Sequence, residues 1–113
     1  MSQITTHILD IALGVPAQKV PISLSVQEGE AWRDVGSGLT NEEGRITGLC
    51  RAGEILPAGT YRMHFDTAVY FESRGQEPFY PWVDVVFNIG GDGQHYHIPL
   101  LLSPFGHSTY RGS

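Results

Sequence analysis

The sequence predicts an all-β protein, a sandwich of two sheets with eight strands and one short helix. Its 113 residues include 14 glycines and 7 prolines, which divide the chain into short runs. Between these turn formers the runs are rich in β-branched and aromatic residues. Short strands at such spacing are typical of a sandwich or a barrel, and eight of them fit two sheets of four.

The expected strands are short runs of β-forming residues bounded by turns. We expect them at Thr5–Asp10, Val20–Gln27, Trp32–Leu39, Arg45–Leu49, Thr60–Asp66, Trp82–Ile89, His95–Leu102 and Ser108–Arg111. Residues 12–17 contain both a glycine and a proline, which favours a loop. Residues 28–30 separate two alternating runs as a hairpin turn does, and residues 41–44 form a turn that delivers Arg45 to its strand.

Only residues 66–75 look helical. Asp66 or Thr67 can cap the first turn, and Gly75 can end the last. The pattern therefore predicts about two turns of helix across the edge of a sheet.

Alternation predicts which face each strand buries, because successive side chains of a strand point to opposite sides. The apolar sets expected in the core are Tyr61, Met63 and Phe65 on one strand, Val83, Val85, Phe87 and Ile89 on the next, and Tyr96, Ile98, Leu100 and Leu102 on a third. On that third strand His95, His97, Pro99 and Leu101 then share the outer face.

This outer face mixes imidazoles with apolar side chains that have no core to enter. If residues 103–107 turn the chain back, either Ser108 and Tyr110 or Thr109 and Arg111 join the same surface. An exposed apolar patch of this kind is usually covered. We expect a second subunit, related by a two-fold axis, to cover it.

Composition excludes several classes of protein. A length of 113 residues fits one domain with its own core. The net charge is −5, and the only cations are Lys19 and six arginines, which argues against a nucleic-acid partner. No signal peptide or membrane-spanning run is visible, and the single cysteine, Cys50, fits a reducing compartment. We expect a cytoplasmic protein without membrane contact, and Cys50 as a small structural residue.

Without further information the candidate chemistry stays open. His95 and His97 could supply two metal ligands, with a third from His7, His64, His107 or a carboxylate, although no spacing selects one. Arg45 and His7 could each be ordinary surface residues, and Asp10 is more typical of a turn carboxylate than of a general base.

Four segments, in order along the chain, resemble a known family. They are Thr6-His7-Ile8-Leu9-Asp10, Gly44-Arg45, the run from His95 to Pro104, and Tyr110-Arg111-Gly112-Ser113. Together they resemble the 5-hydroxyisourate hydrolases, the transthyretin-related enzymes of purine breakdown. Tyr-Arg-Gly-Ser is the most specific of the four, because transthyretins that carry hormone lack it.

The resemblance implies a single transthyretin-like hydrolase domain over residues 1–113. It implies a homotetramer, a dimer of dimers with the site in a channel at the dimer–dimer contact, and no metal or organic cofactor. The residues carried over as catalytic are His7, Arg45, His97 and Ser113, and those carried over as substrate-binding are His7, Arg45, Tyr110 and Ser108. His95 would lie at the channel mouth or in a supporting role, and His107 would point away from the channel.

The implied reaction is hydrolysis of 5-hydroxyisourate to 2-oxo-4-hydroxy-4-carboxy-5-ureidoimidazoline. Either His97 or His7 would activate the water, since an imidazole titrates near neutral pH, and Arg45 would stabilise the developing oxyanion. Whether Ser113 acts through its hydroxyl or a carboxylate stays open. The alternative is a transthyretin-like carrier that binds a small aromatic ligand without catalysis.

Overall fold

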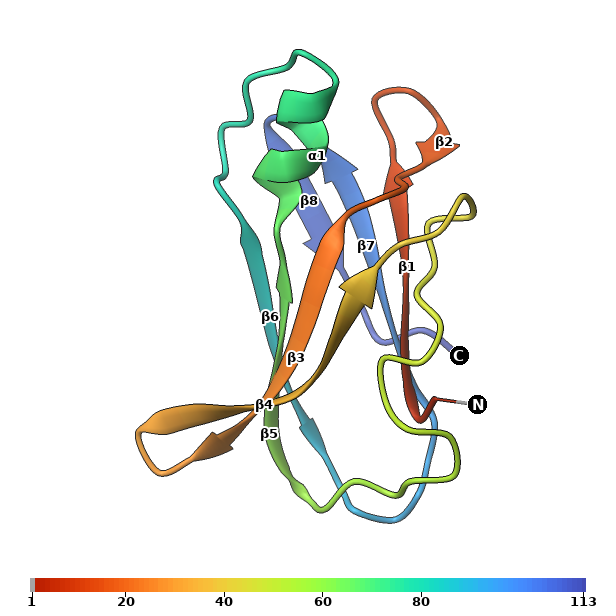
Figure 1. Cartoon of the computed structure of the whole chain (residues 1–113), viewed down its shortest axis with the longest axis vertical. Coiled ribbons are helices and arrows are strands. Elements are labelled where there is room, and N and C mark those ends of the chain that lie inside the picture. The colour runs from red at the N-terminus through yellow and green to blue at the C-terminus, as the bar shows by residue number, and fades with distance from the viewer. Residues whose placement is uncertain (1) are drawn as a thin grey trace.

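The computed structural model describes residues 2–113 and shows two four-stranded sheets packed face to face (Figure 1). The elements are β1 (Ile4–Asp10), β2 (Val15–Pro16), β3 (Pro21–Glu28), β4 (Ala31–Leu39), β5 (Gly59–Phe65), α1 (Thr67–Ser73), β6 (Val83–Ile89), β7 (Tyr96–Ser103) and β8 (Gly106–Thr109). The predicted two-sheet, eight-strand sandwich with one short helix is confirmed.

One sheet has the order β2-β1-β7-β8 and the other β4-β3-β5-β6. The pairing of β1 with β7 is parallel, and every other strand pairing of the two sheets is antiparallel. Parallel neighbours need a crossover connection, and here the whole second sheet lies within that connection. The two ends of the chain, residues 4–16 and 96–109, therefore lie side by side in one sheet.

The core lies between the two sheets and contains the residues that alternation predicts. The inward set of β7 is at most 7% exposed, and that of β5 at most 1%. On β6, Val83 and Ile89 are buried, whereas Val85 and Phe87 are only partly buried against the core. Val85 and Phe87 are less buried because they line a hollow that opens between β6 and β8.

The strand predicted at Arg45–Leu49 is wrong. Arg45 alone forms a bridge, to His7, because Gly44 and Gly48 both have a φ of 74° and this left-handed conformation interrupts a strand. The eighth strand is β2, which lies inside the predicted loop and pairs with Leu9 and Asp10.

The helix lies where the sequence predicts it, but the expected side-chain cap at Asp66 does not form. Asp66 occupies the N-cap position without a side-chain capping bond, and Gly75, with a φ of 71°, follows the last turn. The helix is joined to β1 instead, because the Tyr70 hydroxyl donates a 2.7 Å hydrogen bond to Asp10. Asp10 also accepts from two backbone amides of the following turn, so it is the turn carboxylate that the sequence favours.

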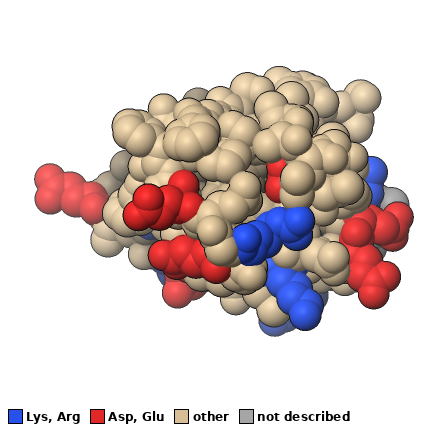
Figure 2. All heavy atoms as spheres, turned by 90° about the horizontal axis from the view of Figure 1, so that it is seen from above, with Lys and Arg blue, Asp and Glu red and all other residues tan. Residues whose placement is uncertain are grey.

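The surface is sparsely charged. Figure 2 shows acidic and basic side chains interspersed at one end of the molecule, with uncharged areas between them. Within residues 2–113 no helix is long and apolar enough to cross a membrane. Cys50 is free and buried, as expected for a structural residue.

Candidate active site

The outer face of the sheet β2-β1-β7-β8 brings the predicted residues together. Arg45 forms its bridge to one side of His7, and Pro99 pairs with His7 on the other side. Residues that pair directly across a sheet project to the same face. A guanidinium and an imidazole, which are 38 positions apart in the sequence (45 − 7), therefore become neighbours.

The register of β8 decides which of its residues share this face. Leu101 pairs with Ser108, and His97 forms a bridge to Gly112. His97 and Leu101 are four residues apart, and so are Ser108 and Gly112, so the same antiparallel register continues between the two pairs. Tyr110 therefore lies on the same side as Ser108. Thr109 and Arg111 face the other way, and this settles the alternative that the sequence leaves open.

The His97 ring is held by a residue that sequence reasoning missed. The Thr5 hydroxyl lies 2.8 Å from Nδ1 of His97 and 3.0 Å from Nε2 of His95. Thr5 pairs directly with His97 across the parallel strands and alternates with His7 along β1. The sequence shows that Thr5 and His7 alternate along one strand. It does not show that this strand pairs with the one that carries His97.

The pKa of His97 is lowered from its usual value. Partial burial contributes most, because it disfavours the charged ring. The positive charge of Arg45 is the next cause, followed by His95 and His7. His97 is therefore neutral at neutral pH and can accept a proton.

Gly112 packs against the other edge of His97. Its amide donates a 2.8 Å hydrogen bond to the carbonyl of His97, and a Cβ at this position would lie 2.8 Å from Cδ2 of the ring and 3.3 Å from Cγ of Pro99. Any side chain there would push against the imidazole. Gly112 and His7 both lie against Pro99, which is buried although it lies on the outer face.

The remaining candidates are less central. Ser113 directly follows Gly112 at this edge and is exposed. His107 pairs with Leu102, a core residue, and its ring stands edge-on to that of Tyr80 at 5.1 Å. As predicted, His107 points away from the face that carries His97.

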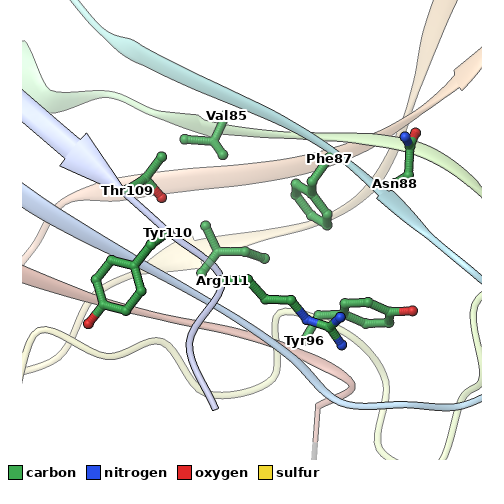
Figure 3. A pocket seen from close by; sticks show the side chains of 8 residues that line it. Val85, Phe87, Asn88, Tyr96, Thr109, Tyr110 and Arg111 are labelled. Carbon is green, nitrogen blue, oxygen red and sulfur yellow. The ribbon is translucent and has the colours of Figure 1, made fainter.

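A separate hollow of about 200 Å³ opens between the sheets, between β6 and β8 (Figure 3). Its walls are mostly apolar, and the Arg111 guanidinium lies 4.6 Å above the Tyr96 ring. Tyr110 also lines the hollow, with its ring directed away from Phe87 (Figure 3). Among the described residues, none that lines the hollow carries an imidazole or a carboxylate to activate water, so the outer face is the better candidate for a hydrolytic site.

A metal site at His95 and His97 would need at least one more ligand. Within the part of the chain that the structure describes, no three His, Cys, Asp or Glu side chains are grouped so that they could hold a metal ion. His95 and His97 instead share the Thr5 hydroxyl.

The fold and this face define a class: two-sheet β-sandwiches whose parallel-paired sheet displays imidazole, guanidinium and hydroxyl groups on its outer side. The family model described as HIUase/Transthyretin family matches residues 4–112, and the chain belongs to this family.

Relatives of both functional kinds are similar to this chain. A mouse protein named 5-hydroxyisourate hydrolase is 48% identical over an alignment of 114 positions, which covers 99% of this chain and 96% of that protein. The structure of Klebsiella pneumoniae 5-hydroxyisourate hydrolase matches with a TM-score of 0.84 and 42% identity over 97% of this chain and 98% of that one. Sea bream transthyretin in complex with thyroxine matches with a TM-score of 0.91 and 34% identity, over 98% and 95% of the two chains.

Proposed function

We propose that this protein is a 5-hydroxyisourate hydrolase. The observation that carries the proposal is the grouping of His7, Arg45 and His97 on one sheet face. Support comes from relatives named 5-hydroxyisourate hydrolase, which are similar over nearly the whole of this chain.

The proposed reaction adds water across a ring amide. His97 or His7 accepts a proton as the water oxygen bonds to the carbonyl carbon, and Arg45 stabilises the negative charge that develops on the carbonyl oxygen. The carbon–nitrogen bond then breaks, and the nitrogen leaves with the proton that the imidazole returns. The product is 2-oxo-4-hydroxy-4-carboxy-5-ureidoimidazoline.

Hydroxyl groups on the same face would orient the substrate. Ser108 and Tyr110 are exposed there and can hydrogen-bond the polar edge of a planar ring, and Ser113 lies close by in the sequence. Such positioning lowers the entropic part of the barrier.

The carrier alternative shares the fold but not the chemistry. The transthyretin match has a higher TM-score than the hydrolase match, 0.91 against 0.84, yet a lower identity, 34% against 42%. Backbone similarity therefore does not separate the two functions. A carrier has no need of a neutral imidazole beside a guanidinium, and this feature favours the enzyme.

We further propose that residues 1–113 act as one domain within a homotetramer, a dimer of dimers with the site in a channel between dimers, in the cytoplasm. The single domain is supported by one core cluster that includes residues of both sheets. Met1 lies outside the described residues. On the candidate face Leu101 is half-buried and Tyr110 is 58% exposed. A second copy over this face would close the open surface into a channel.

The test uses substrate generated by urate oxidase and follows its ultraviolet decay with and without the protein. We expect faster decay with the wild type and a loss of about 10²-fold or more with His97→Ala, the usual contribution of a general base. His107→Ala is the matched control on the opposite face and should keep its activity. Decay no faster than the spontaneous reaction would refute the proposal.

A further inference from the structure

A single hydroxyl joins two imidazoles at the edge of the candidate site. Thr5 Oγ1 lies 2.8 Å from His97 Nδ1 and 3.0 Å from His95 Nε2. The two rings are nearly parallel, with planes 17° apart and centroids 6.4 Å apart. His95 is exposed and His97 is half-buried, so the hydroxyl connects a solvated ring to the ring inside the site.

The chemistry of a hydroxyl links the tautomers of the two rings. A threonine hydroxyl has one proton to donate and lone pairs to accept. If it donates to His95, it accepts from His97, whose proton is then on Nδ1. If it donates to His97, the proton of that neutral ring is on Nε2. The two arrangements differ in which nitrogen of His97 is free to act as a base.

Only the first arrangement suits a general base. With the proton on Nδ1, Nε2 keeps its lone pair, and no described residue of the chain hydrogen-bonds to this nitrogen. After Nε2 has taken a proton, the ring is an imidazolium that must donate from Nδ1, and the same hydrogen bond then becomes charge-assisted and stronger. The bond that selects the basic tautomer thus also stabilises its protonated form.

We propose that Thr5 is a positioning residue that fixes His97 in its Nδ1-protonated tautomer, and that the Thr5 hydroxyl donates its hydrogen bond to Nε2 of His95. The inference rests on the proposed function and names His97 as the base for the water. Proton balance is simple: Nε2 of His97 gains the proton of the water and later gives it to the leaving nitrogen. The Nδ1 proton stays in place throughout.

The packing around His97 supports this assignment. Thr5, His97 and Gly112 form one row across three neighbouring segments. Thr5 holds the Nδ1 edge of the ring, and Gly112 leaves room for the Cδ2 edge, where a Cβ would lie only 2.8 Å away. The ring is therefore confined from both sides in the plane of the row.

The first experiment measures the tautomer directly and needs no substrate. Histidine labelled with ¹⁵N reports by NMR which ring nitrogen carries the proton, and His97→Gln identifies the signal. We expect the Nδ1-protonated form in the wild type and a shift toward the Nε2-protonated form in Thr5→Val. Thr5→Ser keeps the hydroxyl and should keep the wild-type tautomer. His95→Phe keeps a stacked ring but removes the acceptor, so it should shift the tautomer part of the way.

The second experiment measures kinetics on the same variants. Thr5→Val should lower kcat by about 10- to 100-fold, which is less than the roughly 10²- to 10⁴-fold that a general base contributes, because His97 itself is still present, and KM should change little. Thr5→Ser should restore most of kcat. Thr60→Val is the matched control, since it removes a threonine hydroxyl bonded to Asn88 in the other sheet, and it should keep both constants.

The outcomes separate this inference from the proposed function. An Nε2-protonated His97 in the wild type overturns the inference, and so does an unchanged tautomer in Thr5→Val, even if the enzyme is active. A wild type that is inactive toward 5-hydroxyisourate removes the proposed function and leaves the tautomer assignment to stand or fall by NMR alone. The wild-type measurement decides the matter even if Thr5→Val does not fold.

Discussion

At the scale of single residues, the decisive feature is the charge state of His97. Its ring is half-buried beside Arg45, and both burial and the neighbouring cation lower its pKa. A folded-state pKa below the unfolded value means that protonation opposes folding as well as catalysis. As the pH falls, the His97 ring therefore stays neutral at values where a solvated histidine would begin to take up a proton.

Replacing Arg45 tests this account. In Arg45→Gln we expect the pKa of His97 to rise toward its usual value, because a repulsive charge is lost. Titration of the His97 signal by NMR measures the change independently of substrate binding. Arg33→Gln, which removes a guanidinium paired with Glu28 on the other sheet, should leave the His97 titration where it is. A His97 pKa that does not move in Arg45→Gln contradicts the proposed electrostatic coupling.

At the scale of elements, the helix is held to the site-bearing sheet by one buried hydrogen bond. Tyr70 on α1 donates to Asp10 at the end of β1, and both residues are at most 4% exposed. Burial, and then the bond to Asp10, raise the pKa of Tyr70 to about 12. This contribution to stability is complete below the ordinary tyrosine pKa of 10.0 and is lost between there and about pH 12.

Removing the hydroxyl should expose this link. Tyr70→Phe should lower the free energy of unfolding at neutral pH by about 1–3 kcal/mol, because a buried carboxylate loses a donor. Its stability should also fall less steeply than that of the wild type between pH 10.0 and about 12. Chemical denaturation at several pH values measures both effects. Tyr80→Phe, at an exposed tyrosine, is the control, and equal losses in the two variants would argue against the assigned role.

The elements also show what the sequence could and could not predict. Alternation was enough to place His97 outside and Ile98 inside, because the period of a strand is a local property. The prediction of a strand at residues 45–49 was wrong because the pattern of apolar residues does not show that Gly44 and Gly48 adopt a left-handed conformation. The role of Thr5 could not be found, since it depends on a parallel pairing between segments 92 positions apart.

At the scale of the whole molecule, the outer face has an apolar residue that no other part of the chain fully covers. Leu101 is half-buried on the same sheet face as His97, and a second copy on this face would bury it. We expect Leu101→Glu to lower the assembled mass in solution, because a charge in an apolar contact is costly. Light scattering after size-exclusion chromatography measures the mass, and circular dichroism verifies the fold.

The control for this prediction lies on the opposite sheet. Leu39 is 59% exposed, so Leu39→Glu introduces the same charge away from the candidate site and should leave the mass unchanged. An unchanged mass in Leu101→Glu would mean that the molecule assembles through another surface, or that it does not assemble.

The parallel pairing of β1 with β7 has a consequence for synthesis on the ribosome. The hairpin of β3 and β4 and the pair of β5 and β6 join neighbouring segments, so they can form while the chain is still growing. β1 must wait, because its partner β7 is made only after the entire second sheet has been translated. Contacts this distant are slow to form, and during that delay His7 has no neighbour on the β7 side. We therefore expect a nascent chain to fold its second sheet first and to form the face that carries the candidate site last.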